Sequence, residues 1–194
     1  MASYWLEFFE AIAPDVVFVP IGQGSGICAC AAARGHAGAA TRITGVVSAH
    51  ATAYQLSFRQ GRATTAPVTT ELADGLACRV PDPQALEVIC READDVVSVT
   101  DVQVAAAMRA LFADTHNIAE GAGAAALAGA LVQQARWAGC RIGLPLTGGN
   151  VDSAAFARVL AGAKLSGQFR QRQARASAAR AAIDSGKFSF DHTR

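Results

Sequence analysis

A short glycine-rich segment is the part of this sequence best suited to hold a ligand. Residues 22–26, GQGSG, follow the β-branched run 16–19 and precede the small apolar side chains of 27–34, an order that predicts a strand, a loop and a helix. The first N–H groups of a helix have no intrahelical partner, and the helix dipole favours an anion beside them. Glycines also let the backbone approach phosphate oxygens closely. The segment therefore predicts a phosphate-binding loop.

The residues around these glycines leave three interpretations open. A nucleoside-triphosphate loop is not one of them, because it needs a lysine where Ile27 stands. A dinucleotide site needs a third glycine at that position and an acidic residue after the next strand, where residues 45–48 read GVVS, so this interpretation is disfavoured. The other two are a tight turn without a ligand and a loop that holds the single phosphate of a compact cofactor.

Alternating apolar runs and amphipathic stretches predict the elements that position this loop. The expected strands cover 16–19, 42–47, 96–99 and 142–146. The expected helices cover 5–12, 27–34, 51–60, 82–93, 121–138 and 152–161. One more helix is expected to begin at a capping box formed by Thr100 and Gln103. This alternation indicates an α/β fold, an open parallel sheet with helices on both faces. Such sheets bind ligands at the carboxyl ends of their strands, where the loop at 22–26 and a second turn at 147–150 are expected.

Composition narrows the class of protein. The 194 residues are 52% hydrophobic and 17% charged, with a formal net charge of +1, which argues against disorder and against a nucleic-acid-binding protein. No apolar run approaches the length of a membrane span, and the N-terminus lacks the basic region of a signal peptide. Five cysteines without metal-ligand spacing indicate reduced thiols, and hence a cytoplasmic protein.

Charge divides the chain into two parts. Residues 166–194 contain six basic and two acidic side chains, whereas residues 1–165 contain 11 basic and 14 acidic ones. We expect an α/β domain over 1–165 and a basic, loose or disordered tail over 166–194. Lysine is scarce, because only Lys164 and Lys187 occur among the 17 basic residues.

Five segments of the chain occur in the same order in one enzyme family. They are VPIGQGSGICA (19–29), TTELADGLACRVPDP (69–83), DDVVSVTDVQVAAAMR (94–109), NIAEGAGAAALAG (117–129) and LTGGNVD (146–152). Over residues 4–162 the chain resembles the C-terminal half of pyridoxal-phosphate enzymes of the serine/threonine dehydratase type, which share the tryptophan-synthase-β-like fold type II. The resemblance implies that residues 1–165 form an incomplete three-layer large domain.

The resemblance also implies a set of residues that bind pyridoxal 5'-phosphate. They are Gly22, Gln23, Gly24, Ser25, Gly26, Glu120 and Thr147. Backbone N–H groups of the loop would hold the phosphate, and Ser25 would add a hydroxyl donor or serve only as a helix N-cap. Thr147 would bond the pyridine nitrogen, its alternative being a turn hydroxyl. Glu120 would face the cofactor ring; the alternative interpretation is a solvated residue at a helix N-terminus. Asp74 and Gly75 would form an inter-domain loop near the ring, or else a plain turn.

Two departures from the family pattern bear on activity. The family's Schiff-base lysine lies in an N-terminal half that this sequence does not include, and Lys164 and Lys187 fall beyond the last matching segment. We therefore expect no catalytic residue in this chain and no turnover by the chain alone. Some relatives bind a divalent ion after the second strand, where this sequence has Val47, Ala51 and Ala53, so we expect no metal there.

The function that the resemblance implies is that of an amino-acid ammonia-lyase, which converts L-threonine or L-serine to a 2-oxo acid and ammonia. Without the other half of the family fold, the chain would expose an apolar edge or face. The expected partners are therefore a complementing N-terminal chain or further copies of this one, besides the amino-acid substrate, and neither nucleic acid nor a membrane. A non-catalytic binding or assembly module and a Rossmann-type nucleotide-binding protein are the alternatives.

Overall fold

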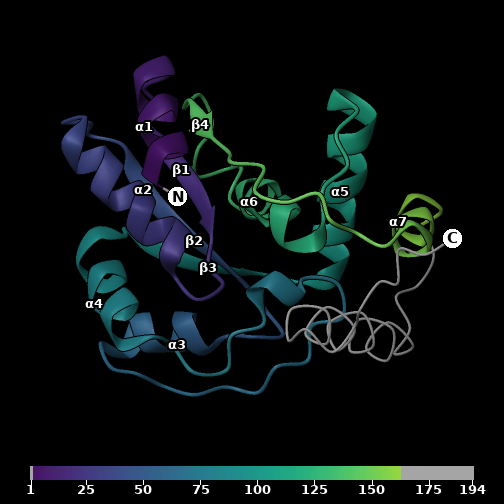
Figure 1. The fold of residues 1–194 in the computed structure, drawn as a ribbon, viewed down its shortest axis with the longest axis horizontal. Coiled ribbons are helices and arrows are strands. Elements are labelled where there is room, and N and C mark those ends of the chain that lie inside the picture. Colours follow the sequence, from purple (N-terminus) through teal and green to yellow (C-terminus); the bar gives the residue numbers. More distant parts are fainter. Residues whose placement is uncertain (1, 163–194) are drawn as a thin grey trace, which may run out of the picture.

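A four-stranded parallel sheet forms the centre of the molecule in the computed structural model, which describes residues 2–162 (Figure 1). The strands are β1 (Val16–Pro20), β2 (Arg42–Ser48), β3 (Asp95–Val99) and β4 (Ile142–Gly143), in the order β3-β2-β1-β4. The helices are α1 (Ala2–Ala11), α2 (Ser25–His36), α3 (Ala53–Gln60), the 3-10 turn η1 (Asp74–Leu76), α4 (Pro83–Glu92), α5 (Asp101–Thr115), α6 (Gly121–Val132) and α7 (Ser153–Leu160). The predicted α/β class and parallel sheet are confirmed.

The strand side chains alternate between two hydrophobic cores. Val16 and Phe18 of β1 pack with α5, α6 and α7, whereas Val17 and Val19 pack with α1, α2, α3 and α4 on the other face. All four side chains are buried, as expected for a strand of a parallel sheet that is covered on both faces. The sheet is therefore a rigid platform from which the loops at its carboxyl ends project.

The strand β4 is shorter than the predicted 142–146. It pairs with β1 only through Val16 opposite Ile142 and Val17 opposite Gly143. Pro145 has no N–H to continue the ladder, and the chain leaves the sheet before it. The segment 145–147 lines a pocket instead.

Side-chain caps begin three of the helices. The Thr100 side chain accepts the Gln103 N–H while the Gln103 side chain accepts the Thr100 N–H, so the predicted capping box of α5 is confirmed. Asp82 caps α4 by accepting the Ala85 N–H at 2.8 Å. Asp152 caps α7 in the same way.

The helix predicted over 121–138 is wrong at its C-terminal end, because α6 stops at Val132. The following turns bring the buried Trp137 ring against the guanidinium groups of Arg42 and Arg136, which lie 5.5 and 5.3 Å from the ring centroid. These cation–π contacts with the first residue of β2 need a turn rather than a continued helix. The first helix also ends earlier than predicted, and Ile12 is 44% exposed.

None of the helices in residues 2–162 combines the length and the apolar character that a membrane span requires. The expectation for the tail at 166–194 lies outside the described residues.

Candidate functional site

The glycine segment forms the turn between β1 and the N-terminus of α2. Gly24 is the N-cap residue with φ 97°, a left-handed conformation that favours glycine, and as a glycine it has no side chain to cap the first turn. Ser25 is the first helical residue, so the alternative prediction that Ser25 serves as the N-cap is wrong. A Cβ on Gly24 would lie 2.5 Å from the Ala85 Cβ and 3.1 Å from the Tyr54 hydroxyl. The turn is therefore closely packed from behind.

The outer glycines of the segment have different surroundings. A Cβ on Gly22 would overlap with the Gly75 carbonyl oxygen, so this glycine lets the turn η1 pack against the loop. A Cβ on Gly26 would meet only the Pro20 carbonyl oxygen, at 4.0 Å. Protein packing thus accounts for glycine at position 22 but not at position 26. Gly26 borders open space, where a missing side chain leaves room for a ligand beside the helix N-terminus.

Two buried aromatic residues hold this loop in place. The Tyr54 hydroxyl donates to the Gln23 carbonyl oxygen at 2.8 Å and accepts the Asp82 N–H at 3.1 Å. The Trp5 indole N–H donates to the Gly26 carbonyl oxygen at 3.1 Å. Trp5 falls within the helix predicted over 5–12 and Tyr54 within the one predicted over 51–60, but neither contact with the loop was predicted, because no local pattern signals it.

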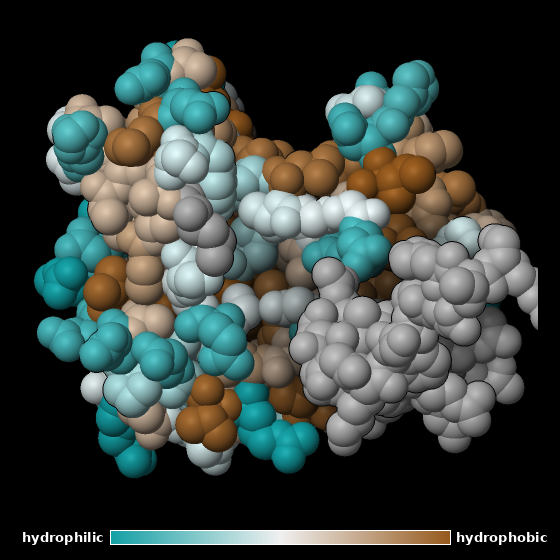
Figure 2. All heavy atoms as spheres, in the orientation of Figure 1, coloured by the Kyte–Doolittle hydropathy of each residue, from teal (hydrophilic) through white to brown (hydrophobic). Residues whose placement is uncertain are grey.

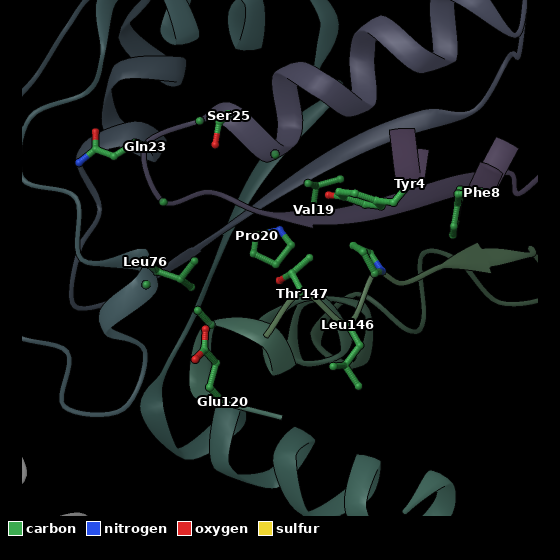
Figure 3. Close-up of a pocket in the computed structure, with 16 residues that line it drawn as sticks. Tyr4, Phe8, Val19, Pro20, Gln23, Ser25, Leu76, Glu120, Leu146 and Thr147 are labelled. Carbon is green, nitrogen blue, oxygen red and sulfur yellow. The ribbon is translucent and has the colours of Figure 1, made fainter. Parts of the chain in front are cut away.

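A pocket of about 810 Å³ lies between this loop, α1, η1, α6 and the segment after β4 (Figure 3). It is within the usual size range of small-molecule sites. All seven predicted site residues border it, together with Tyr4 and with apolar and small residues that the prediction did not include. The lining residues are Tyr4, Phe8, Val19, Pro20, Gly22, Gln23, Gly24, Ser25, Gly26, Gly75, Leu76, Glu120, Ala122, Pro145, Leu146 and Thr147.

The polar side chains of the pocket come from α1, where Tyr4 lies, and from three further places in the fold. In Figure 3 the Ser25 hydroxyl points into the pocket from α2, Thr147 lies across from it, and Glu120 stands at the start of α6. The Gln23 side chain points away from Ser25 and Thr147. The structure brings the predicted residues together, while their role in binding a cofactor stays a prediction.

Glu120 lies where α6 meets the turn after β4. Its N–H donates to the Gly148 carbonyl oxygen at 2.9 Å. A Cβ on Gly148 would overlap with the Glu120 carboxylate, so a side chain at position 148 would displace that carboxylate. Burial raises the pKa of the Glu120 carboxyl above its ordinary value, the nearby Asp74 carboxylate raises it further, and a hydrogen bond from the Asn150 backbone opposes the shift.

The turn that carries Asp74 and Gly75 is fastened to α5. The buried Asp101 carboxylate accepts the Thr70 hydroxyl and the Glu71 N–H, both at 2.7 Å. The Thr70 hydroxyl in turn accepts the Ala73 N–H. These bonds place η1 against the glycine loop, so Gly75 lines the pocket rather than forming a remote surface turn.

The donors at the pocket fit an elongated ligand with a phosphate at one end and a ring at the other. The uncapped helix N-terminus and the open space at Gly26 suit a phosphate. The Thr147 hydroxyl can bond a ring nitrogen, and the apolar side chains can pack against a ring. Within residues 2–162, no group of three or more His, Cys, Asp and Glu side chains is placed to hold a metal ion.

Comparison with known proteins points to one family. The family model of pyridoxal-phosphate dependent enzymes matches residues 1–148. The chain is 36% identical over 149 residues to an L-threonine ammonia-lyase of Geobacter sulfurreducens, covering 76% of this chain and 37% of that protein. It is also 36% identical over 159 residues to a phenylserine dehydratase of Ralstonia pickettii, covering 80% and 48%.

Solved structures agree with this similarity. A threonine deaminase of T.th. superimposes with a TM-score of 0.72 at 27% identity, over 78% of this chain and 57% of that one. Maize serine racemase superimposes with a TM-score of 0.73 at 27% identity, over 83% and 50%. The chain spans less than half the length of the two curated relatives named above.

Proposed function

Because this chain belongs to the family of pyridoxal-phosphate dependent enzymes, we propose that it forms the phosphate-binding and ring-binding part of an amino-acid ammonia-lyase. The complete enzyme would convert L-threonine or L-serine to a 2-oxo acid and ammonia. The observation that carries this proposal is the pocket in which the uncapped N-terminus of α2, the Thr147 hydroxyl and the Glu120 carboxyl meet. The relatives named threonine ammonia-lyase and phenylserine dehydratase support the choice of reaction.

Each end of the pocket would have its own task. Backbone N–H groups of residues 24–26 would hold the phosphate, with the helix dipole favouring its charge. The Thr147 hydroxyl would bond the pyridine nitrogen without protonating it, which gives a milder electron sink than a carboxylate partner would. When bound, pyridoxal phosphate supplies the electron sink for loss of the α-proton and the β-hydroxyl. Glu120 would close the wall of the pocket near the ring.

The lysine that such chemistry needs would come from outside the residues that form this pocket. Lys164 and Lys187 both lie after α7, beyond the last segment that matches the family. The complete enzyme would therefore include a second part that carries this lysine and the loop for the substrate carboxylate. The matched region covers only 37% and 48% of the two relatives, which supports such a part.

The face around β4 is the place where we expect this second part to dock. In the described residues β4 stands at the edge of the sheet and pairs only with β1. Leu144 and Leu146, which follow it, are 37% and 42% exposed, and Figure 2 shows apolar side chains gathered between α1 and α5. A strand added to this edge would pair the free backbone groups and cover these side chains.

Titration with pyridoxal phosphate, in buffer free of phosphate and sulfate, tests the proposal. The matched variants are Gly26→Asp and Gly35→Asp, because each adds one carboxylate to α2 and neither added Cβ would overlap with another atom. Gly26→Asp places the charge at the proposed phosphate site, so we expect binding to be lost. Gly35→Asp places it at the other end of the helix and should leave binding unchanged. Thr147→Ala should weaken binding less than Gly26→Asp does.

Activity provides the second test. We expect no 2-oxo acid from L-threonine or L-serine with the purified chain, and activity once the complementary half of a relative is co-expressed with it. Turnover by the chain alone would contradict the assignment of the lysine to a second part. Saturable binding of a nicotinamide dinucleotide without binding of pyridoxal phosphate would favour a Rossmann-type protein, and binding of neither would favour a non-catalytic module.

A further inference from the structure

Tyr54 holds the phosphate-binding loop from behind the pocket. It lies in the first turn of α3, is 1% exposed and does not line the pocket. Its hydroxyl donates to the Gln23 carbonyl oxygen at 2.8 Å and accepts the Asp82 N–H at 3.1 Å. Asp82 is the N-cap of α4, so this hydroxyl joins the loop to the start of a second helix. A tyrosine hydroxyl has one proton to donate, and here the loop receives it.

The bond to Gln23 determines the direction of the next N–H group. The carbonyl of Gln23 and the N–H of Gly24 belong to one planar trans peptide, in which the two groups point in opposite directions. The carbonyl points to Tyr54, on the side away from the pocket. The Gly24 N–H therefore points to the pocket side of the loop, which Gly24 lines.

Glycine at position 24 makes this orientation depend on Tyr54. A residue without a Cβ has few restrictions on its backbone, so the peptide before it turns easily when its hydrogen bond is lost. The Gly24 backbone has φ 97° and lies against Ala85 and the Tyr54 hydroxyl. The hydroxyl thus supplies both a contact and a directed hydrogen bond at the least restricted point of the loop.

We propose that Tyr54 is a positioning residue for the cofactor phosphate: it fixes the Gln23–Gly24 peptide so that the Gly24 N–H donates to that phosphate. The inference rests on the proposed function, because it needs a phosphate in the pocket. Burial raises the pKa of Tyr54 to about 12, so its hydroxyl keeps its proton and stays a donor in neutral solution.

Two ligands that differ only in the phosphate test this role. 4-Deoxypyridoxine 5'-phosphate and 4-deoxypyridoxine have no aldehyde and form no Schiff base, so their affinities report binding alone. We expect Tyr54→Phe to lower the affinity for the phosphorylated ligand about tenfold, the effect of one hydrogen bond to a charged group, and to leave the other affinity unchanged. Isothermal titration of the full chain measures both.

Ser57→Ala is the matched control. Ser57 is a buried residue of the same helix, and its hydroxyl bonds to the Thr64 backbone, away from the loop. This variant also loses a buried hydroxyl and should keep the wild-type ratio of the two affinities.

The outcomes separate the inference from the proposed function. If the wild type prefers the phosphorylated ligand and Tyr54→Phe keeps that ratio, or lowers both affinities equally, the positioning role is wrong. If the wild type shows no preference for the phosphorylated ligand, the phosphate site itself is wrong, and the role of Tyr54 is wrong with it.

A measurement on the wild type keeps the inference testable should Tyr54→Phe not fold. In ¹⁵N-glycine-labelled protein, the Gly24 amide proton should move downfield when 4-deoxypyridoxine 5'-phosphate is added, as a new hydrogen bond to phosphate requires. A response of Gly26 without one of Gly24 would overturn the inference.

Discussion

The contact between α6 and the turn after β4 allows a prediction that separates tertiary packing from helix propensity. Gly123 is a buried residue of α6. A Cβ at this position would overlap with the Gly148 carbonyl oxygen and lie 2.9 Å from the Gly148 nitrogen. Because these are backbone atoms, the whole turn that carries Thr147 would have to move in a Gly123→Ala variant.

The magnitude follows from three contributions to the free energy of unfolding. Alanine in place of glycine in a helix stabilises by about 1 kcal/mol. Overpacking against the turn costs about 1–3 kcal/mol, and loss of the bond between the Glu120 N–H and Gly148 costs about 1 kcal/mol. Gly123→Ala should therefore destabilise the protein by about 1–3 kcal/mol. Each kcal/mol should lower the Tm by roughly 2–4 °C.

Gly35→Ala is the matched control for this prediction. Gly35 lies in α2, and a Cβ there would meet no atom within 4 Å. This variant should be as stable as the wild type or more stable, by up to about 1 kcal/mol. Thermal unfolding followed by circular dichroism compares the two. The reasoning is refuted if Gly123→Ala unfolds at or above the wild-type temperature.

Three further predictions concern the described part of the chain. Thr100→Ala should cost about 1 kcal/mol in urea unfolding, because it removes one half of the α5 capping box; an unchanged midpoint would contradict the role of the cap. Burial raises the pKa of the Glu120 carboxyl, so as pH rises above the ordinary value of 4.5 the unfolded state loses this proton before the folded state does. Stability should therefore fall as pH rises from about 4.5 to the higher pKa of the folded state. Glu120→Gln should flatten that fall in Tm between pH 4 and pH 7, and an unchanged slope would count against the buried carboxyl. Burial raises the pKa of Cys30 to about 12, whereas Cys140 is exposed. A thiol reagent at neutral pH should therefore label Cys140 in the native protein and Cys30 only after unfolding. Peptide mass spectrometry can identify the labelled cysteines.

The sequence predicted those elements whose signals are local. The runs 16–19, 42–47 and 96–99 became β1, β2 and β3 with ends within one residue of the prediction. Continuous β-branched stretches have few alternatives when both faces of a sheet are covered. The capping box of α5 was predicted for the same reason, since the Thr100 side chain bonds to backbone only three residues away.

Contacts between distant segments account for the differences. Residues 133–136, QQAR, would continue a helix by propensity, but Trp137 packs against Arg42, which lies far away in the sequence. The predicted site residues came from a resemblance, and the structure placed them around one pocket. Tyr54 escaped prediction because its partners, Gln23 and Asp82, are about 30 residues away on either side.

The two tryptophans of the chain lie in different places relative to the pocket, so their fluorescence can be compared when a ligand binds. Trp5 bonds to the backbone of Gly26 beside the pocket. Trp137 lies at the opposite end of the sheet, against Arg42 at the start of β2 and against Arg136, which pairs with Asp95 at the start of β3. A ligand in the pocket would change the emission of the first indole and leave that of the second nearly constant. Intrinsic fluorescence of a Trp137→Phe variant would therefore report occupancy of the pocket alone, without any label attached to the protein.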